Sequence, residues 1–197
     1  MLISLFLGIA GFILYFIYDI NSITRRNRLL GCSFFAGCIL IVCASAIQLY
    51  KAIELHAFSS ASDIILIILG IISFVCLIYC LFFALPFEET YVDPEKGRGV
   101  YDKGVYALCR HPGVLCFFAM YLFIGLAALP SDLLLCGMVF SLLNFLYVIF
   151  QDLITFPKTF YDYSEYKKTV PFIIPTNKSL RRAVGTMRLN NRKEDSK

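Results

Sequence analysis

Residues 113–150 read GVLCFFAMYLFIGLAALPSDLLLCGMVFSLLNFLYVIF, which is two apolar runs joined by Pro130-Ser131-Asp132. Each run approaches the ~20 mostly apolar residues that a helix needs to cross the hydrocarbon core of a bilayer. Two helices joined by so short a connection lie antiparallel. The stretch therefore predicts a helical hairpin in a membrane, formed by residues 113–129 and 133–150.

The composition of the whole chain agrees with a membrane location. Hydrophobic residues make up 59% of the 197 residues and charged residues 16%, whereas soluble chains carry about 25% charged residues. Residues 1–20 lack a basic start and an A-x-A cleavage site, so we expect a retained helix rather than a signal peptide. The fold class predicted is all-α: an integral membrane protein with about five transmembrane helices, a C-terminal interfacial helix and a cytoplasmic tail. The expected membrane segments are residues 2–18, 29–50, 64–87, 113–129 and 133–150.

Basic residues predict the orientation of the chain. With the N-terminus outside, every Lys and Arg of the 18 except Lys51 falls in a cytoplasmic part. Cytoplasmic loops carry an excess of Lys and Arg. We therefore expect the N-terminus outside and the C-terminus in the cytoplasm, in a bacterial inner membrane or an ER-type membrane. Residues 1–175 are expected to form a single domain, with residues 176–197 as a basic, disordered tail.

The cysteines and the net charge argue against two classes of partner. Nearly all of the eight cysteines lie in apolar runs, and none forms a CxxC or a Cys/His metal spacing. They are expected to pack as small apolar side chains, so no metal site is predicted. The net charge of +4 is concentrated in loops and the tail, without an aromatic-rich basic surface. No nucleic acid is expected as a partner.

Polar residues gather where the predicted hairpin meets the cytoplasm. Arg110 and His111 precede its first helix, and Gln151 and Asp152 follow its second helix. Because antiparallel helices return to the same membrane level, we expect these two pairs to lie at one depth. Such side chains at a membrane boundary are costly unless they are used. Residues three or four apart share one face of a helix, and the second helix carries such a polar stripe: Ser141, Asn144, Tyr147 and Gln151.

This set of side chains suits a zwitterionic ligand. Arg110 can bind a carboxylate through two parallel hydrogen bonds, and Asp152 can pair with an ammonium group. The tyrosines of residues 160–166 can stack on a base or a cation. Those groups form the polar part of S-adenosylmethionine, but a lipid headgroup would suit the same side chains.

One segment resembles a family signature. Gly104-x-Tyr106-x-x-x-Arg110-His111-Pro112 is similar to the motif of the integral-membrane methyltransferases related to isoprenylcysteine carboxyl methyltransferase and phospholipid methyltransferases. Further along, that family has a Glu-Glu pair, two tyrosines three apart and a closing V-P-x-x-I-P. The resemblance covers roughly residues 97–176. The matching positions here are Gln151-Asp152, Tyr163 and Tyr166, and the closing residues 170–175, VPFIIP.

The resemblance implies S-adenosylmethionine-dependent methyl transfer to a lipophilic acceptor at the cytoplasmic face. The acceptor would be an isoprenoid, an isoprenylcysteine-like carboxylate or a lipid headgroup. Arg110 and His111 are the candidate catalytic residues. The candidate cofactor-binding residues are Tyr106, Arg110, His111, Pro112, Gln151 and Asp152, and the candidate acceptor-binding residues are Asn144, Tyr147, Tyr163 and Tyr166.

Several positions depart from the family pattern. Val114 stands where the family has tyrosine, Cys116 stands where glycine is usual, and Gln151-Asp152 replaces the two glutamates. Two alternatives therefore stay open. One is an NADPH-dependent membrane reductase, which would be expected to carry Asn-Tyr where this chain has Gly113-Val114. The other is a non-catalytic membrane protein that keeps the methyltransferase fold.

Overall fold

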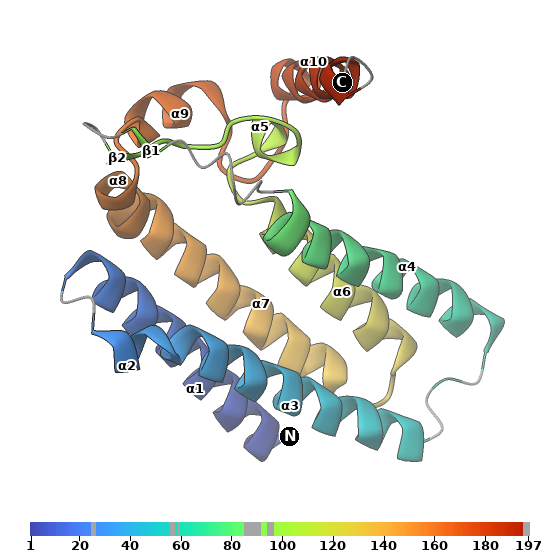
Figure 1. The fold of residues 1–197 in the computed structure, drawn as a ribbon. Coiled ribbons are helices and arrows are strands. Elements are labelled where there is room, and N and C mark those ends of the chain that lie inside the picture. The colour runs from blue at the N-terminus through green and yellow to red at the C-terminus, as the bar shows by residue number, and fades with distance from the viewer. Residues whose placement is uncertain (25–26, 56–57, 59, 85–91, 94–96, 195–197) are drawn as a thin grey trace. The chain divides into compact units, whose positions relative to one another are not determined.

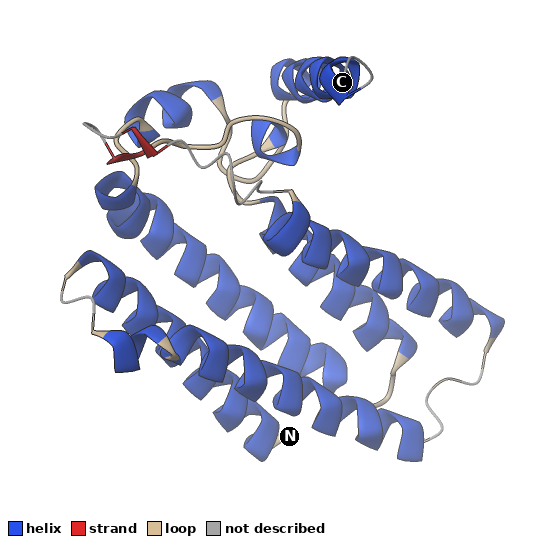
Figure 2. Cartoon of the chain, in the orientation of Figure 1, coloured by secondary structure: helices blue, strands red, loops and turns tan. Residues whose placement is uncertain are grey.

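The computed structural model describes residues 1–24, 27–55, 58, 60–84, 92–93 and 97–194. Helices account for most of these residues, as Figure 2 shows. The chain forms two compact units, and each is described by itself. Unit 1 consists of Met1–Val75 and Cys116–Thr155, and unit 2 consists of Cys76–Leu115 and Phe156–Lys197.

Long apolar helices build unit 1 (Figure 1). Four helical stretches are long and apolar enough to cross a membrane: Leu2–Ile23, Arg28–Glu54, Ala61–Phe83 and Leu133–Thr159. Pro112–Ala127 is a shorter apolar helix. The predicted all-α membrane fold is confirmed, while the number of spans stays a prediction.

The elements of unit 1 are α1 (Leu2–Ile23), α2 (Arg28–Gly31), α3 (Ser33–Glu54), α4 (Ala61–Ile78), α6 (Pro112–Ala127), α7 (Leu133–Phe150) and the π-helical turn η2 (Gln151–Thr155). The last residues of α4 and the first residues of α6 belong to unit 2.

Small and polar residues bring the helices of unit 1 together. Helix α1 packs against both α3 and α7. A Cβ atom added at Gly8 would lie 2.0 Å from Cε1 of Phe140, so α1 and α7 approach at this glycine. Between α1 and α3, Nε2 of Gln48 donates to Oγ of Ser4 at 2.9 Å. Small residues and interhelical hydrogen bonds are the usual means of helix association in lipid, where burial of apolar surface gives no advantage.

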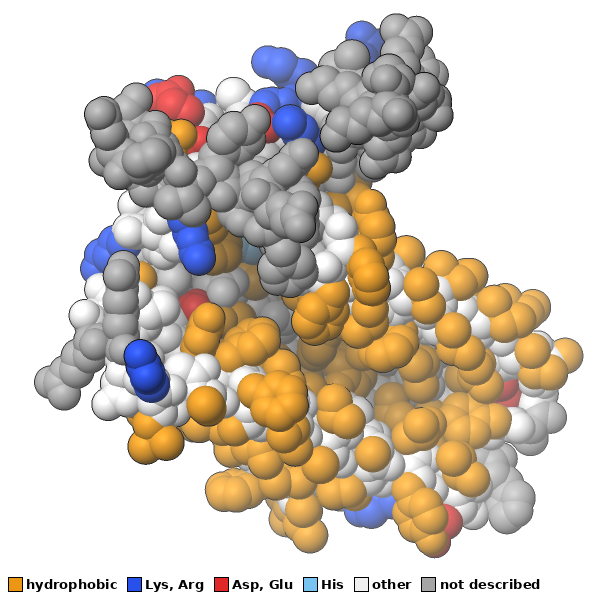
Figure 3. Space-filling view, viewed as in Figure 1, with side chains coloured by type: hydrophobic (Ala, Val, Ile, Leu, Met, Phe, Trp, Pro, Cys, Tyr) orange, Lys and Arg blue, Asp and Glu red, His pale blue; other side chains and the backbone are white. Residues whose placement is uncertain are grey.

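The outward faces of these helices are apolar. Phe6 is 73% exposed and Phe35 is 70% exposed. Figure 3 shows hydrophobic side chains gathered over the helices of unit 1. Apolar surface of this extent is not stable in water. It fits a unit whose solvent is the lipid bilayer.

Unit 2 contains short elements around a small aromatic core. Strands β1 (Val92–Asp93) and β2 (Gly97–Arg98) pair antiparallel. The core consists of Tyr163, Tyr166 and Val170. The remaining elements are the π-helical turn η1 (Tyr79–Phe83), α5 (Val105–Leu108), α8 (Phe156–Thr159), α9 (Tyr163–Thr169) and α10 (Asn177–Glu194).

Between α7 and the tail, where the predicted C-terminal interfacial helix falls, the chain forms two short helices, α8 and α9. They are separated because Phe160 forms a parallel bridge with Arg98, and the amide of Tyr161 donates to the carbonyl of Arg98 at 3.2 Å. These pairings to β2 draw the backbone out of the helix. Residues 85–87, predicted as the end of the third membrane segment, lie outside the described residues.

The structure also differs from the predicted disordered tail, because residues 177–194 form α10. The backbone amide of Thr176 donates to Oγ of Ser179 at 2.9 Å, and the amide of Ser179 donates to Oγ1 of Thr176 at 3.2 Å. Such a reciprocal pair caps a helix N-terminus. Arg182 then pairs with Asp102, and Thr186 accepts a hydrogen bond from the amide of Gly104 at 3.1 Å. These contacts hold the first turns of α10 to the rest of unit 2.

Candidate functional site

The Arg110-His111-Pro112 segment is hydrogen-bonded to the closing segment of the chain. In unit 2, the amide of Arg110 donates to the carbonyl of Pro171 at 2.9 Å, and the amide of His111 donates to the carbonyl of Phe172 at 3.2 Å. Pro112 is the first residue of α6. A proline is well placed there because the first amides of a helix have no intrahelical partner. The two ends of the predicted motif thus form one local structure.

Arg110 caps helix α9. Its Nη1 donates to the carbonyl of Val170 at 2.7 Å and to the carbonyl of Lys167 at 3.4 Å. The guanidinium carbon also lies 5.4 Å from the centre of the Phe172 ring. A cation at the C-terminal end of a helix interacts favourably with the helix dipole. Arg110 therefore has a structural role in unit 2.

His111 lies in an aromatic environment. Its side chain is 7% exposed. The imidazole stacks on Phe156, with ring centres 5.7 Å apart and planes at 11°, and meets Phe172 edge to face at 5.1 Å. The orientation of the imidazole is thereby fixed by packing.

Tyr106 and Tyr166 form a chain of hydrogen bonds. The hydroxyl of Tyr166 donates to the carbonyl of Tyr106 at 2.7 Å, and the hydroxyl of Tyr106 donates to the carbonyl of Cys80 at 2.9 Å. Burial raises the pKa of both phenols above the ordinary value. Nearby thiols add to the increase at Tyr106, and Tyr106 itself adds to it at Tyr166. Both side chains are therefore protonated donors near neutral pH.

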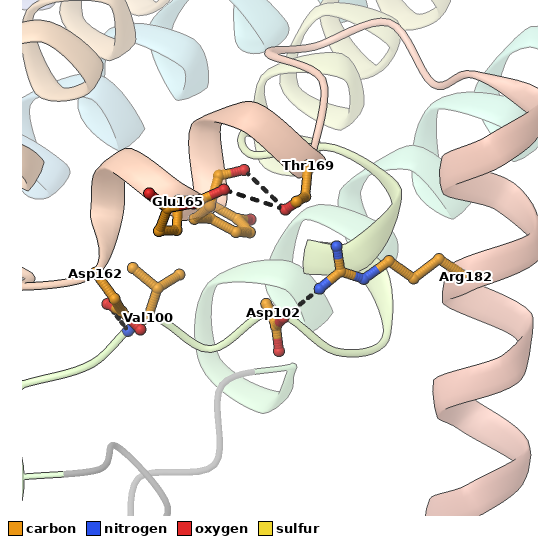
Figure 4. Close-up of a pocket in the computed structure, with 7 residues that line it drawn as sticks. Val100, Asp102, Asp162, Glu165, Thr169 and Arg182 are labelled. Atoms are coloured by element: carbon orange, nitrogen blue, oxygen red, sulfur yellow. Dashed lines mark hydrogen bonds and ion pairs between the residues drawn. The ribbon is translucent and has the colours of Figure 1, made fainter.

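Tyr163 and Tyr166, predicted to bind the acceptor, lie in the core of unit 2. Tyr163 is buried against Phe156 and Phe160, with ring centres 5.5 Å and 6.4 Å apart. Tyr166 also lines a pocket of about 190 Å³. The other residues that line this pocket are Val100, Asp102, Asp162, Glu165, Thr169 and Arg182, as Figure 4 shows.

This pocket does not suit the predicted cofactor. Its three carboxylates already have partners within unit 2: Asp102 pairs with Arg182, Asp162 accepts from the amide of Val100 at 2.8 Å, and Glu165 accepts from Lys168 at 2.7 Å. Pockets for small molecules usually measure about 300–1,000 Å³. The pocket in Figure 4 is smaller than that range.

The predicted polar stripe follows one side of α7 in unit 1. Ser141 and Tyr147 are buried, while Asn144 and Gln151 are half-buried. Nε2 of Gln151 donates to the hydroxyl of Tyr147 at 2.9 Å. Asp152 is buried in the π-helical turn η2. Such turns are frequent at functional sites because the extra residue re-aims the side chains that follow.

Asp19, on α1, belongs to the same polar group but was not among the predicted site residues. It is 3% exposed. Its carboxyl group lies within hydrogen-bonding reach of the side chains of Tyr147, Gln151 and Thr155. The signal in the sequence was a single acid directly after the first predicted membrane segment, residues 2–18; an acid that lies in a membrane helix indicates a functional position, and Asp19 lies in α1.

The predicted site residues are divided between the units. Unit 2 brings Tyr106, Arg110, His111, Tyr163 and Tyr166 together with the closing segment. Unit 1 holds Tyr147, Gln151 and Asp152, with Asn144 one turn before Tyr147 on α7, and Asp19 joins them from α1. The expected common depth of the Arg110-His111 and Gln151-Asp152 pairs stays a prediction, because the pairs belong to different units.

Comparison with protein-family models, with curated proteins and with solved structures found no match.

Proposed function

We propose that this chain is an S-adenosylmethionine-dependent membrane methyltransferase that acts on a lipophilic acceptor. The observation that carries the proposal is the pairing of Arg110 and His111 with Pro171 and Phe172. The sequence resembles the methyltransferase signature at both places, although 60 residues separate Arg110 from Val170. Their association in one local structure supports the view that the resemblance extends to the fold of this part of the chain.

The side chains present also have the chemistry that the cofactor requires. S-Adenosylmethionine presents an ammonium group, a carboxylate, an adenine ring and a sulfonium group. In unit 1, the carboxyl group of Asp152 and the neighbouring amide of Gln151 have the acceptor oxygens that an ammonium group requires. The aromatic rings around His111 fit a purine. When bound, the cofactor supplies the reactive methyl group, and the protein has to align it with the acceptor.

The tyrosines are poor candidates for a catalytic base. An acceptor carboxylate needs no base, whereas a hydroxyl or amine acceptor does. Tyr106 and Tyr166 have raised pKa values, and both hydroxyls already donate to backbone carbonyls. We therefore assign the role of base, for such acceptors, to His111. The proposed acceptor classes are an isoprenoid, an isoprenylcysteine-like carboxylate and a lipid headgroup.

Cofactor binding to the detergent-purified protein tests the proposal. S-Adenosylmethionine and S-adenosylhomocysteine are titrated into the wild type, Arg110→Ala and Asp152→Asn by isothermal calorimetry. We expect saturable micromolar binding that both substitutions weaken about tenfold or more, since each removes a charge-assisted hydrogen bond. Arg181→Ala and Asp132→Asn, at exposed positions of α10 and of the α7 N-terminus, are the matched controls and should bind as the wild type does.

Arg110→Ala also removes the cap of α9, so its folding is checked by circular dichroism and gel filtration. Absence of binding at millimolar cofactor by a folded wild type would exclude the methyltransferase function. NADPH is titrated in parallel, and its saturable binding would indicate the reductase instead. Binding of neither cofactor would leave the non-catalytic alternative, for which the structural role of Arg110 is the supporting observation.

A further inference from the structure

Asp19 occupies a position that packing fixes. It lies four residues before the end of α1, which ends at Ile23. Tyr15 and Phe16, one turn earlier, each contact the ring of Tyr147 with centres 5.4 Å apart. Phe16 also meets Phe150 at 5.1 Å. These aromatic contacts hold the end of α1 against the end of α7, which places the carboxyl group of Asp19 beside Gln151.

The hydrogen bonds around Asp19 use only one side of its carboxyl group. Nε2 of Gln151 donates to the hydroxyl of Tyr147, so this hydroxyl can direct its own proton to Asp19. The second oxygen, Oδ2, is buried and has no hydrogen-bond partner among the residues that the structure describes. A buried acceptor without a donor is costly, and a carboxylate inside a membrane helix is costly unless a donor or cation faces it.

Among the described residues, the side chains within hydrogen-bonding reach of Asp19 do not provide that charge. Tyr147, Gln151 and Thr155 are all neutral side chains. An amide at position 19 would keep the same shape without the cost of burying a charge. An aspartate with one oxygen facing neutral side chains, and the other without a donor among the described residues, is the arrangement expected of a site for a cationic group.

We propose that Asp19 and Gln151 together bind the ammonium group of the cofactor's amino-acid moiety, with Asp19 supplying a negative charge in addition to the acid already assigned there, Asp152. This inference rests on the methyltransferase function proposed above and adds a residue from α1 to it. Tyr147 is a positioning residue, because its hydroxyl orients the carboxyl group of Asp19. Oε1 of Gln151 can accept a second hydrogen bond from the same ammonium group.

The proposal explains why position 151 carries an amide. Two carboxylates side by side in a buried site cannot both ionise readily, because each disfavours the charged form of the other. With Asp19 already present, a glutamate at 151 would add a second negative charge beside it. The glutamine removes that repulsion and keeps the hydrogen-bonding capacity. The negative charge is thus carried by α1 rather than by residue 151.

A charge-relocation experiment tests this arrangement. S-Adenosylmethionine binding is measured by calorimetry for the full-length wild type, Asp19→Asn, Gln151→Glu and the double variant Asp19→Asn/Gln151→Glu. We expect Asp19→Asn to weaken binding about tenfold or more, the loss expected for one charge-assisted hydrogen bond. Gln151→Glu alone should also weaken binding, because it places two acids together. The double variant, in which the acid of position 19 is moved to position 151, should recover most of the wild-type affinity.

Two controls separate an ammonium contact from a general disturbance. 5′-Methylthioadenosine lacks the amino-acid moiety, so its affinity should be the same for the wild type and Asp19→Asn. Asp132→Asn makes the same substitution in unit 1, at the exposed N-terminal end of α7, and should leave both ligands unaffected.

The outcomes distinguish this inference from the proposed function. If the wild type binds S-adenosylmethionine and Asp19→Asn binds it equally well, the role of Asp19 is refuted and the proposed function stands. An equal loss for both ligands would also refute it, because the effect would then be structural. If the folded wild type binds no S-adenosylmethionine, the proposed function and this inference are both wrong.

Discussion

Arg110 and Tyr166 show how residues of a sequence motif can also hold a fold together. Arg110 donates to the last carbonyls of α9. Tyr166 donates from the same helix to the carbonyl of Tyr106, on α5. The position of a residue in a sequence motif therefore does not tell whether the residue binds a ligand or supports the fold. Measuring both stability and ligand binding on the same variants distinguishes the two roles.

Tyr166→Phe should destabilise unit 2. The substitution keeps the ring in the core and removes only the hydroxyl, so the carbonyl of Tyr106 loses its donor. A buried group left without its partner costs about 1–3 kcal/mol. The free energy of unfolding, measured in detergent with denaturant, should fall by that amount. Tyr161→Phe, at an exposed tyrosine, is the control, and an equal effect of the two substitutions would contradict the prediction.

The same hydroxyl predicts a loss of stability at alkaline pH. Burial raises the pKa of Tyr166, and Tyr106 adds to the increase. The folded chain therefore holds this proton more tightly than the unfolded chain, in which a tyrosine has a pKa of about 10. The stabilisation is complete below that pH and is lost as the pH rises toward the folded pKa. The melting temperature should fall above pH ~10, and less steeply in Tyr166→Phe. Identical slopes would show that another group is responsible.

At the scale of elements, the contact of α1 with α7 determines where Asp19 lies. The two helices approach at Gly8, where a Cβ atom would meet the ring of Phe140. Gly8→Ala should therefore force the helices apart and cost about 1–3 kcal/mol, as other overpacked cores do. Gly31→Ala is the control, because a Cβ atom there would have nothing within 4 Å. Thermal unfolding in detergent measures both, and an unaffected Gly8→Ala variant would argue against this close approach.

The membrane helices could be predicted because apolar length is a local property of the sequence. Residues 133–150 were predicted as a membrane segment, and α7 runs from Leu133 to Phe150. Helix α10 was missed because its residues are polar. What stabilises it are specific contacts: the reciprocal bonds of Thr176 and Ser179, and the pairing of Arg182 with Asp102. Composition does not record such contacts.

The candidate site was predictable only where its residues form a motif. Arg110 and His111 were found because they lie in a short recognisable segment, and Gln151 was found by its spacing along one helix. Asp19 lies in a different helix from Gln151, and no periodicity connects the two. Their proximity results from the packing of α1 against α7, which a single sequence does not reveal.

At the scale of the whole molecule, the basic residues and the apolar helices together predict one orientation in the bilayer. With Lys51 as the single basic residue outside, the N-terminus is predicted to face the outside and the C-terminus to face the cytoplasm. The proposed methyltransferase function depends on this orientation, because it places the Arg110-His111 segment on the side from which a soluble cofactor arrives. The reverse orientation would put that segment outside the cell or in the lumen.

Labelling of introduced cysteines tests the orientation. The eight native cysteines are replaced by alanine, and then either Lys51→Cys, at the end of α3, or Arg181→Cys, on α10, is added. Both positions are exposed in the structure. A membrane-impermeant maleimide applied to intact cells or right-side-out vesicles should label the Lys51→Cys variant alone, and inside-out vesicles should give the opposite pattern. Labelling of the Arg181→Cys variant in intact cells would contradict the predicted orientation. The proposed cofactor site would then need a supply of S-adenosylmethionine outside the cytoplasm.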